Sequence, residues 1–398
     1  MMLYTNNFKL ILLFTIVLVF IFNASIYSEE KLMRDDLIIN QLEKLNLSDL
    51  QEEVSRINQE MQGEFPLLNI KDLLFSIVRG EFQGELSWQE ISKILLKNLG
   101  REITLNFNLL GQIIILLVIS AILSIFHQSF SSKTISNTAN TLIFLIIAVL
   151  ILQAFQVAIS IGIDAIDSMV SFMLALFPVL LALLLSMGAL SSAAIFHPLT
   201  YVIITTLSTA IHYIVFPMIF MSTVISIVTR INENISLTRL AKLFKEISMS
   251  ILALLLMLFI GGLLLQGGAA AVADSLTLRT AKYLTGTFVP VIGGIFSDAV
   301  DLIVSCSLII KNALNFFSMF VIIVIMAMPV VKLIALIFIY KLASAIIQPI
   351  ADSRLVDILD DTANSLIMVF LVVAAVSIMF FIVLTVIVGT ANLTVMMR

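Results

Sequence analysis

The sequence contains one cysteine, Cys306, and three histidines. A single cysteine excludes an internal disulfide and a cysteine-based zinc site. The histidines His127, His197 and His212 are not four residues apart and have no cluster of carboxylates beside them. A histidine metal site is therefore not expected. We predict no bound metal and no cofactor.

Enzyme motifs are also missing. The sequence has no HExxH zinc helix, no Walker A loop and no GxSxG elbow. No pair of membrane aspartates stands in the context of an intramembrane protease. No basic run of the kind expected for nucleic-acid binding occurs. We therefore predict a protein that is not an enzyme, has no nucleic-acid partner, and draws any energy from a partner or a gradient.

Charge is scarce. Only 12% of the residues are charged and 60% are hydrophobic, whereas soluble domains carry about 25% charge. This composition predicts an all-α, polytopic membrane protein. More than half of the charged side chains fall in residues 1–106, which separates a charged N-terminal part from a membrane part.

Three regions follow from this division. Residues 1–28 have Lys9 before a short apolar run and small residues after it, which predicts a signal peptide or an N-terminal anchor. Residues 29–105 have apolar residues at helical spacing, and predict an exported helical domain. Docking to partners and a solvated cap both remain open for it. Residues 106–398 form the polytopic membrane domain.

Eight apolar segments of the membrane domain are candidate spans, because about 20 residues cross the hydrocarbon core. They lie at 107–126, 140–160, 168–187, 199–229, 248–268, 313–331, 333–350 and 364–388. We expect about seven to nine spans, with broken or re-entrant segments. Pro178 and Pro217 are expected to kink their helices.

Lysine and arginine in short loops indicate the cytoplasmic side. The loop after residue 229 is basic and is expected inside, whereas the acidic segment 351–363 is expected outside and Arg398 inside. An external N-terminal domain followed by four crossings would place the basic loop outside. We therefore expect one segment between 168 and 229 either to be re-entrant or to be divided differently, and the small, polar connection 188–198 is the candidate for irregular backbone at membrane depth.

Residues 261–301 combine glycine pairs, a proline and charges within an apolar region. Irregular backbone at membrane depth persists only where protein buries it or where it lines a wet cavity, and such breaks lie near transport paths. We predict a broken segment here; an ordinary helix ending near Gly267 and followed by a surface loop is the alternative. The candidate backbone breaks are Gly261, Gly262, Gly267, Gly268, Pro290, Gly293, Gly294, Pro178, Pro198 and Pro217.

Charged groups inside membrane segments are costly and are commonly functional. Lys341 lies near the middle of a predicted span, where Asp298 or Asp301 could pair with it; a snorkelling lysine is the alternative. Asp164 and Asp167 are expected in an outer loop. The candidates for lining or gating a path are Lys341, Asp298, Asp301, Arg279, Lys282, Asp274 and Lys311.

Four stretches resemble the stage III sporulation protein AE family of endospore-forming Firmicutes. They are SSAAIFHPLTYVI at 191–203, AAAVADSLTLRTAKYLTGTFVPVIGG at 269–294, IYKLASAIIQPIADS at 339–353 and the terminal ANLTVMMR. The likeness extends over most of the chain, and no catalytic residue belongs to the family pattern.

This resemblance implies a large multi-pass subunit in the mother-cell membrane around the forespore, with its N-terminal domain on the extracytoplasmic side. It implies a transenvelope channel complex, partly like secretion machines, that is needed for late forespore gene expression. The implied partners are the other stage III A operon membrane proteins and a forespore-side partner.

Two further functions remain open. A free-standing small-molecule permease would be expected to have two related halves, and we find no convincing internal repeat. A structural assembly scaffold would use its membrane charges for packing. Small residues such as Gly188 and Ala269 allow close helix approach, which suits tight packing or a homo-oligomer in the lipid bilayer.

Overall fold

The computed structural model describes most of the chain as helix. The described residues are 38, 41–42, 45–61, 68–79, 88–129, 133–231, 237–288 and 292–396. Within these ranges every regular element is helical, and six segments are long and apolar enough to cross a membrane. The prediction of an all-α polytopic membrane protein is confirmed, whereas the count of seven to nine spans is not. The expected signal segment 1–28 lies outside the described residues.

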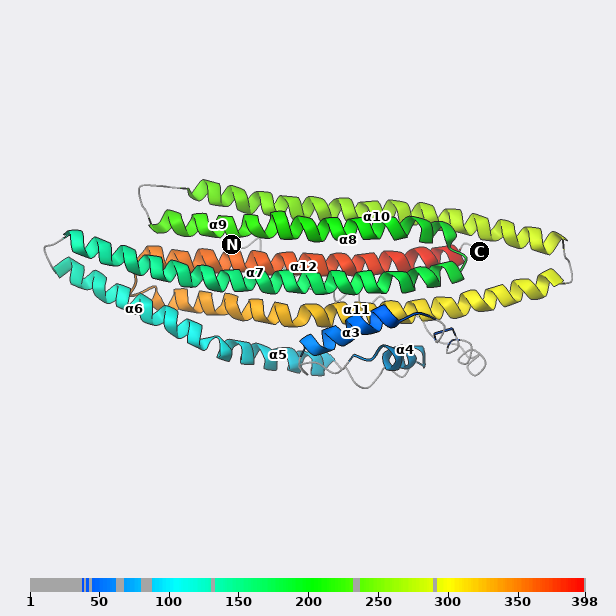
Figure 1. Cartoon of the computed structure of the whole chain (residues 1–398), viewed down its shortest axis with the longest axis horizontal. Coiled ribbons are helices and arrows are strands. Elements are labelled where there is room, and N and C mark those ends of the chain that lie inside the picture. The colour runs from blue at the N-terminus through cyan, green and yellow to red at the C-terminus, as the bar shows by residue number, and fades with distance from the viewer. Residues whose placement is uncertain are drawn as a thin grey trace.

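Three shorter helices begin the described chain: α3 (Ser48–Glu60), α4 (Ile70–Arg79) and α5 (Trp88–Leu105). Helix α3 buries Leu50, Val54 and Ile57, which follow one another at helical spacing. Helices α3 and α4 pack against α7 and α11 respectively and lie along the side of the bundle (Figure 1). Helix α5 leads through Asn106 directly into α6 (Phe107–Ser129).

The bundle consists of long helices that run side by side (Figure 1). They are α7 (Lys133–Ser186), α8 (Leu190–Ala210), a π-helix (Ile211–Val215), α9 (Phe216–Ile231), α10 (Thr238–Phe288), α11 (Ile292–Ile347) and α12 (Ser353–Met396). Helices α6 and α7, α9 and α10, and α11 and α12 are connected at one end of the bundle, on the left in Figure 1. We call this the basic end, because Arg230, Arg239, Lys242 and Lys245 lie near it.

The long helices exceed a bilayer. Helix α11 has 56 residues and α12 has 44, which at a rise of about 1.5 Å per residue gives roughly 84 and 66 Å, against about 30 Å of hydrocarbon. Four predicted spans are therefore wrong as separate elements. The segments 140–160 and 168–187 belong to α7, and 313–331 and 333–350 belong to α11. The first junction contains Gly162 and the second is Lys332 alone, but one glycine costs a helix only about 1 kcal/mol, and both helices continue through.

The predicted placement of the acidic segment 351–363 opposite the basic loop is wrong. Arg230 of α9 binds Asp357 and Asp361 of α12, so both segments lie at the basic end. The described C-terminus of α12 lies at the opposite end (Figure 1), which also contradicts the prediction that it shares a side with the basic loop. Because α7 is one helix, three passes separate the start of α5 from the basic loop, and no re-entrant segment is required.

Within the predicted broken segment 261–301, the helix is interrupted between Phe288 and Ile292, where α10 ends and α11 begins, and not at the first two glycine pairs. Helix α10 continues from Thr238 to Phe288, so Gly261, Gly262, Gly267 and Gly268 lie inside it. A glycine costs a helix only about 1 kcal/mol relative to alanine, and strong helix formers flank these glycines. Helix α11 begins at Ile292 and includes Gly293 and Gly294 in its first turn. Pro290 lies outside the described residues.

The three remaining prolines among the predicted breaks have two different outcomes. Pro178 lies inside α7 and Pro198 inside α8, and neither ends its helix. Pro217 follows the π-helix, in which the Phe216 N–H donates to the Ile211 carbonyl. Because proline has no N–H to give, the wider π turn absorbs the missing hydrogen bond.

Gly188 marks the tight turn between α7 and α8. Its φ is +78°, a region that glycine adopts without the steric cost of a side chain. A Cβ at this position would lie 2.8 Å from Leu278 Cδ2 of α10. The predicted irregular connection 188–198 is therefore a short turn, and α8 begins at Leu190.

Two glycine substitutions distinguish a continuous α10 from a broken one. Gly262→Ala should raise the free energy of unfolding by about 0.5–1 kcal/mol, because alanine is the better helix former and nothing lies within 4 Å of the added Cβ. The measurement is thermal unfolding of the purified chain in detergent. Gly188→Ala is the matched control and should lower stability; a loss in Gly262→Ala of the same size would contradict a continuous α10.

Candidate functional site

Helix α12 carries a polar stripe near the basic end. Asp357, Asp360, Asp361 and Asn364 recur at the i, i+3, i+4 and i+7 positions that share one helix face. The pairs at i and i+4 divide this stripe between two neighbours. Asp357 and Asp361 face α9, whereas Asp360 and Asn364 face α11.

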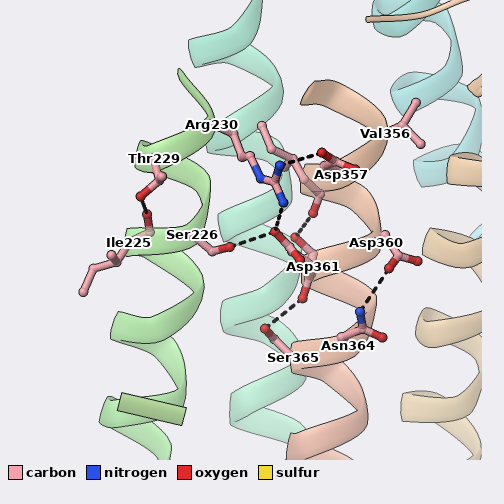
Figure 2. A network of polar contacts seen from close by, with 12 residues as sticks. Ile225, Ser226, Thr229, Arg230, Val356, Asp357, Asp360, Asp361, Asn364 and Ser365 are labelled. Carbon is pink, nitrogen blue, oxygen red and sulfur yellow. Dashed lines mark hydrogen bonds and ion pairs between the residues drawn. The ribbon is translucent and has the colours of Figure 1, made fainter. Parts of the chain in front are cut away.

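On the α9 side, Arg230 binds two carboxylates (Figure 2). Its Nη1 lies 2.6 Å from Asp357 Oδ2 and its Nη2 lies 3.3 Å from Asp361 Oδ2. The Ser226 hydroxyl, one turn earlier on α9, donates to the same Asp361 oxygen at 2.9 Å. Arginine suits this position because its rigid fork presents several donors at once.

On the α11 side, Lys341 binds α12. Its Nζ forms an ion pair with Asp360 Oδ1 and donates to Asn364 Oδ1 at 3.1 Å. Asn364 Nδ2 in turn donates to Asp360 Oδ2 at 3.0 Å. The three side chains therefore form a closed triangle of hydrogen bonds between the two helices.

Lys245 of α10 lies near this cluster and interacts electrostatically with Asp361 and Lys341. The hydrogen bonds and ion pairs of the cluster join α9, α11 and α12, and with Lys245 nearby three cations balance three carboxylates. We call it the polar network, and its members are Ser226, Arg230, Lys245, Lys341, Asp357, Asp360, Asp361 and Asn364. The Lys341 and Asp360 side chains are 39% and 47% exposed.

The turn before α12 fixes the start of the stripe. The Arg354 N–H donates to Asp352 Oδ1 at 3.0 Å, the hydrogen bond of a helix N-cap. The Arg354 guanidinium also binds Asp352 and lies 5.4 Å from the centre of the Phe144 ring of α7. Hydrogen bonding from the Arg354 side chain lowers the pKa of Asp352.

A second lysine of α11, Lys311, binds α12 towards the end of the bundle opposite the basic end. Its side chain is fully buried, and Nζ donates to the Val388 carbonyl and to Asn392 Oδ1, each at 3.0 Å. Lys311 and Lys341 are thirty residues apart on α11, or about 45 Å. Each uses an asparagine of α12 as one acceptor.

Asp274 is buried but binds backbone. Its Oδ1 accepts the Ser191 N–H at 2.6 Å and its Oδ2 accepts the Ser192 N–H at 3.0 Å. These amides belong to the first turn of α8, whose own cap residue Ala189 makes no side-chain hydrogen bond. Asp274 therefore caps α8 from α10, where a carboxylate satisfies free amides and the helix dipole.

The remaining predicted site residues do not join the polar network. Arg279 is exposed on α10. Asp301 lies on the same helix as Lys341, forty residues away or roughly 60 Å, so this possible partner does not reach Lys341. Asp298 lies further along this helix, and its side chain, like that of Lys282, is outside the described part of the structure.

Asp164 and Asp167 lie within α7, and the prediction of an outer loop is wrong. The Asp167 carboxylate lies 3.2 Å from His212 Nε2. His212 belongs to the π-helix before Pro217, and π turns within α-helices are frequently found at functional sites. The interaction links α7 to the only irregular turn within the described α8–α9 segment.

The comparisons with known proteins agree with one another. The family model of stage III sporulation protein AE matches residues 68–391. The chain belongs to the stage III sporulation protein AE family. It is 41% identical over 328 residues to stage III sporulation protein AE of Bacillus subtilis (strain 168), covering 82% of each chain. No solved structure matches.

For this sporulation membrane protein, sequence reasoning found Lys341 and missed its partners. The α12 stripe could have been found, since its spacing is that of one helix face. Its acidic residues instead favour a loop when the sequence is considered alone. Arg230 was used only as a sign of the cytoplasmic side, and nothing in the sequence indicates which helix it contacts.

A charge exchange tests the contact between α11 and α12. We expect Lys341→Asp and Asp360→Lys each to lower the stability and membrane abundance of the chain, because each places two like charges together and strands Asn364. The double variant should recover most of the loss. Exposed pairs contribute about 0.2–1 kcal/mol, so the loss from like charges should exceed the loss in Lys341→Met.

The measurement is a double-mutant cycle of thermal unfolding in detergent, with membrane abundance read by immunoblot. Lys242→Asp, on the exposed face of α10, is the control for a charge reversal outside the polar network. If the double variant is no better than the sum of the single variants, the Lys341–Asp360 contact contributes nothing to the fold.

Proposed function

We propose that the chain is a non-enzymatic multi-pass subunit of the stage III A transenvelope channel complex, which links mother cell and forespore during endospore formation. In this role it supports late forespore gene expression. Its partners are the other stage III A membrane proteins and a forespore-side protein. The observation that carries the proposal is the family match over residues 68–391.

The lengths of the helices support a role in a complex that extends beyond one membrane. Helices of 51–56 residues, such as α10 and α11, are more than twice as long as about 30 Å of hydrocarbon requires. The parts of these helices that exceed the hydrocarbon thickness provide surfaces outside the lipid. A channel that crosses two membranes requires such surfaces for docking its other subunits.

The charge pattern supports one orientation in the mother-cell membrane. The basic end holds Arg239, Lys242 and Lys245 close to a short connection, and such loops stay in the cytoplasm. In the proposed orientation, three passes separate the basic end from the start of α5, and α3, α4 and the start of α5 lie on the extracytoplasmic side. This is where a forespore-side partner can reach the N-terminal helices.

A scaffold function is the second candidate, and the contacts of Lys341 and Lys311 favour it. Both lysines bind α12, through Asp360, Asn364, Val388 and Asn392. A lysine whose ammonium group is already bound by acceptors of a neighbouring helix holds the two helices together. It is then not free to contact cargo. In a scaffold the chain assembles the complex, and another subunit forms the path.

Complementation tests the proposal. In an endospore-forming host that lacks its own family member, we expect the chain to restore a late forespore reporter and to co-purify with the other stage III A membrane proteins. The same host lacking one of those proteins is the control and should lose the reporter signal. Restoration in that control would contradict a complex and favour a free-standing permease.

A further inference from the structure

The α5–α6 junction forms one wall of a cleft. The cleft has a volume of about 300 Å³, which is within the range of small-molecule sites. Helices α7 and α11 form the other walls. The lining residues are Glu102, Asn106, Leu109, Ala154, Val157, Ile161, Lys332 and Leu336. The cleft is separate from the polar network and from the α11 lysines that bind α12.

The cleft holds one carboxylate and one ammonium group. Glu102 is only 9% exposed, and Lys332 of α11 is half-buried. Within the described ranges, neither side chain has an ion-pair partner within 4 Å. Opposite charges that share a cleft without touching leave room for a ligand that carries both signs.

The polarity of the chain changes at this cleft. Helix α5 carries Lys97, Arg101 and Glu102 in its second half, whereas α6 contains no Asp, Glu, Lys or Arg. Such a change from charged to apolar sequence is expected at the level of lipid headgroups. Beyond it, Ile115 and Ile119 of α6 are 61% and 44% exposed, so an apolar surface extends from the cleft along α6.

We propose that this cleft binds a phospholipid whose headgroup carries both a phosphate and a primary ammonium group, as phosphatidylethanolamine does. The Lys332 ammonium binds the lipid phosphate, and the Glu102 carboxylate accepts hydrogen bonds from the headgroup ammonium. The acyl chains cover Leu109, Val157 and the exposed face of α6. The bound lipid thereby joins α6 to α11.

The same chemistry selects against other phospholipids. Phosphatidylglycerol has no cation, so it leaves the Glu102 carboxylate unpaired beside the lipid phosphate. Phosphatidylcholine has a cation without N–H donors, so it cannot hydrogen-bond to Glu102. Specificity of this kind comes from leaving a polar group unsatisfied in the wrong complex.

Lipid retention tests the proposal. The full chain is placed in vesicles with equal amounts of phosphatidylethanolamine and phosphatidylglycerol, extracted with mild detergent, and its retained lipids are measured by mass spectrometry. We expect phosphatidylethanolamine to be enriched on the order of tenfold, the equivalent of one charge-assisted contact. Glu102→Gln should abolish the enrichment, and Lys332→Gln should lower retention of both phospholipids.

Two further variants keep the test independent of folding. Val157→Trp leaves both charges in place but fills the cleft, because Val157 lies in its wall and is 58% exposed; it should lose the retained lipid. Lys242→Gln, on an exposed side chain of α10, is the matched control and should retain the enrichment. Equal retention of both phospholipids by the unsubstituted chain, or enrichment that persists in both Glu102→Gln and Val157→Trp, would overturn the proposal.

Discussion

A cation on an apolar helix must find an acceptor, and on α11 the acceptor is α12. Lys341 binds Asp360 and Asn364 near the basic end, and Lys311 binds Val388 and Asn392 about 45 Å away. Two such contacts fix the register of two long helices, because a shift of one residue would separate both lysines from their partners. Packing between apolar side chains alone discriminates less between registers.

Helix α12 is the element on which the rest of the bundle is arranged. It packs against α7, α9, α10 and α11, and its apolar residues from Leu366 to Ile387 are largely buried. The polar network gives α12 its position at the basic end, since Arg230 draws α9 to the same carboxylates that flank Lys341. The acidic start of α12 therefore lies beside basic segments, where their opposite charges compensate one another.

The sequence alone predicted an all-α membrane protein and the family, and it singled out Lys341 among the charged residues of the predicted spans. It did not predict where helices continue. Glycine pairs and isolated charges suggest interruptions, but Gly261 and Gly262 cost a helix little, and Asp167 lies inside α7, with its carboxylate 3.2 Å from His212 Nε2. Continuity depends on neighbouring helices that a one-dimensional pattern does not contain. The predicted membrane sides of the acidic segment 351–363 and of the C-terminus were wrong for the same reason. Each false interruption adds one membrane crossing to the predicted count.

The central claim is that the acidic start of α12 and the basic start of α10 share one side of the membrane. With Cys306 replaced by serine, single cysteines at Thr238, Ile350 and Leu190 can be labelled in intact cells with a membrane-impermeant thiol reagent. All three positions are exposed. We predict that Thr238→Cys and Ile350→Cys are protected together and Leu190→Cys is labelled. Labelling of Ile350→Cys with protection of Thr238→Cys would contradict this fold.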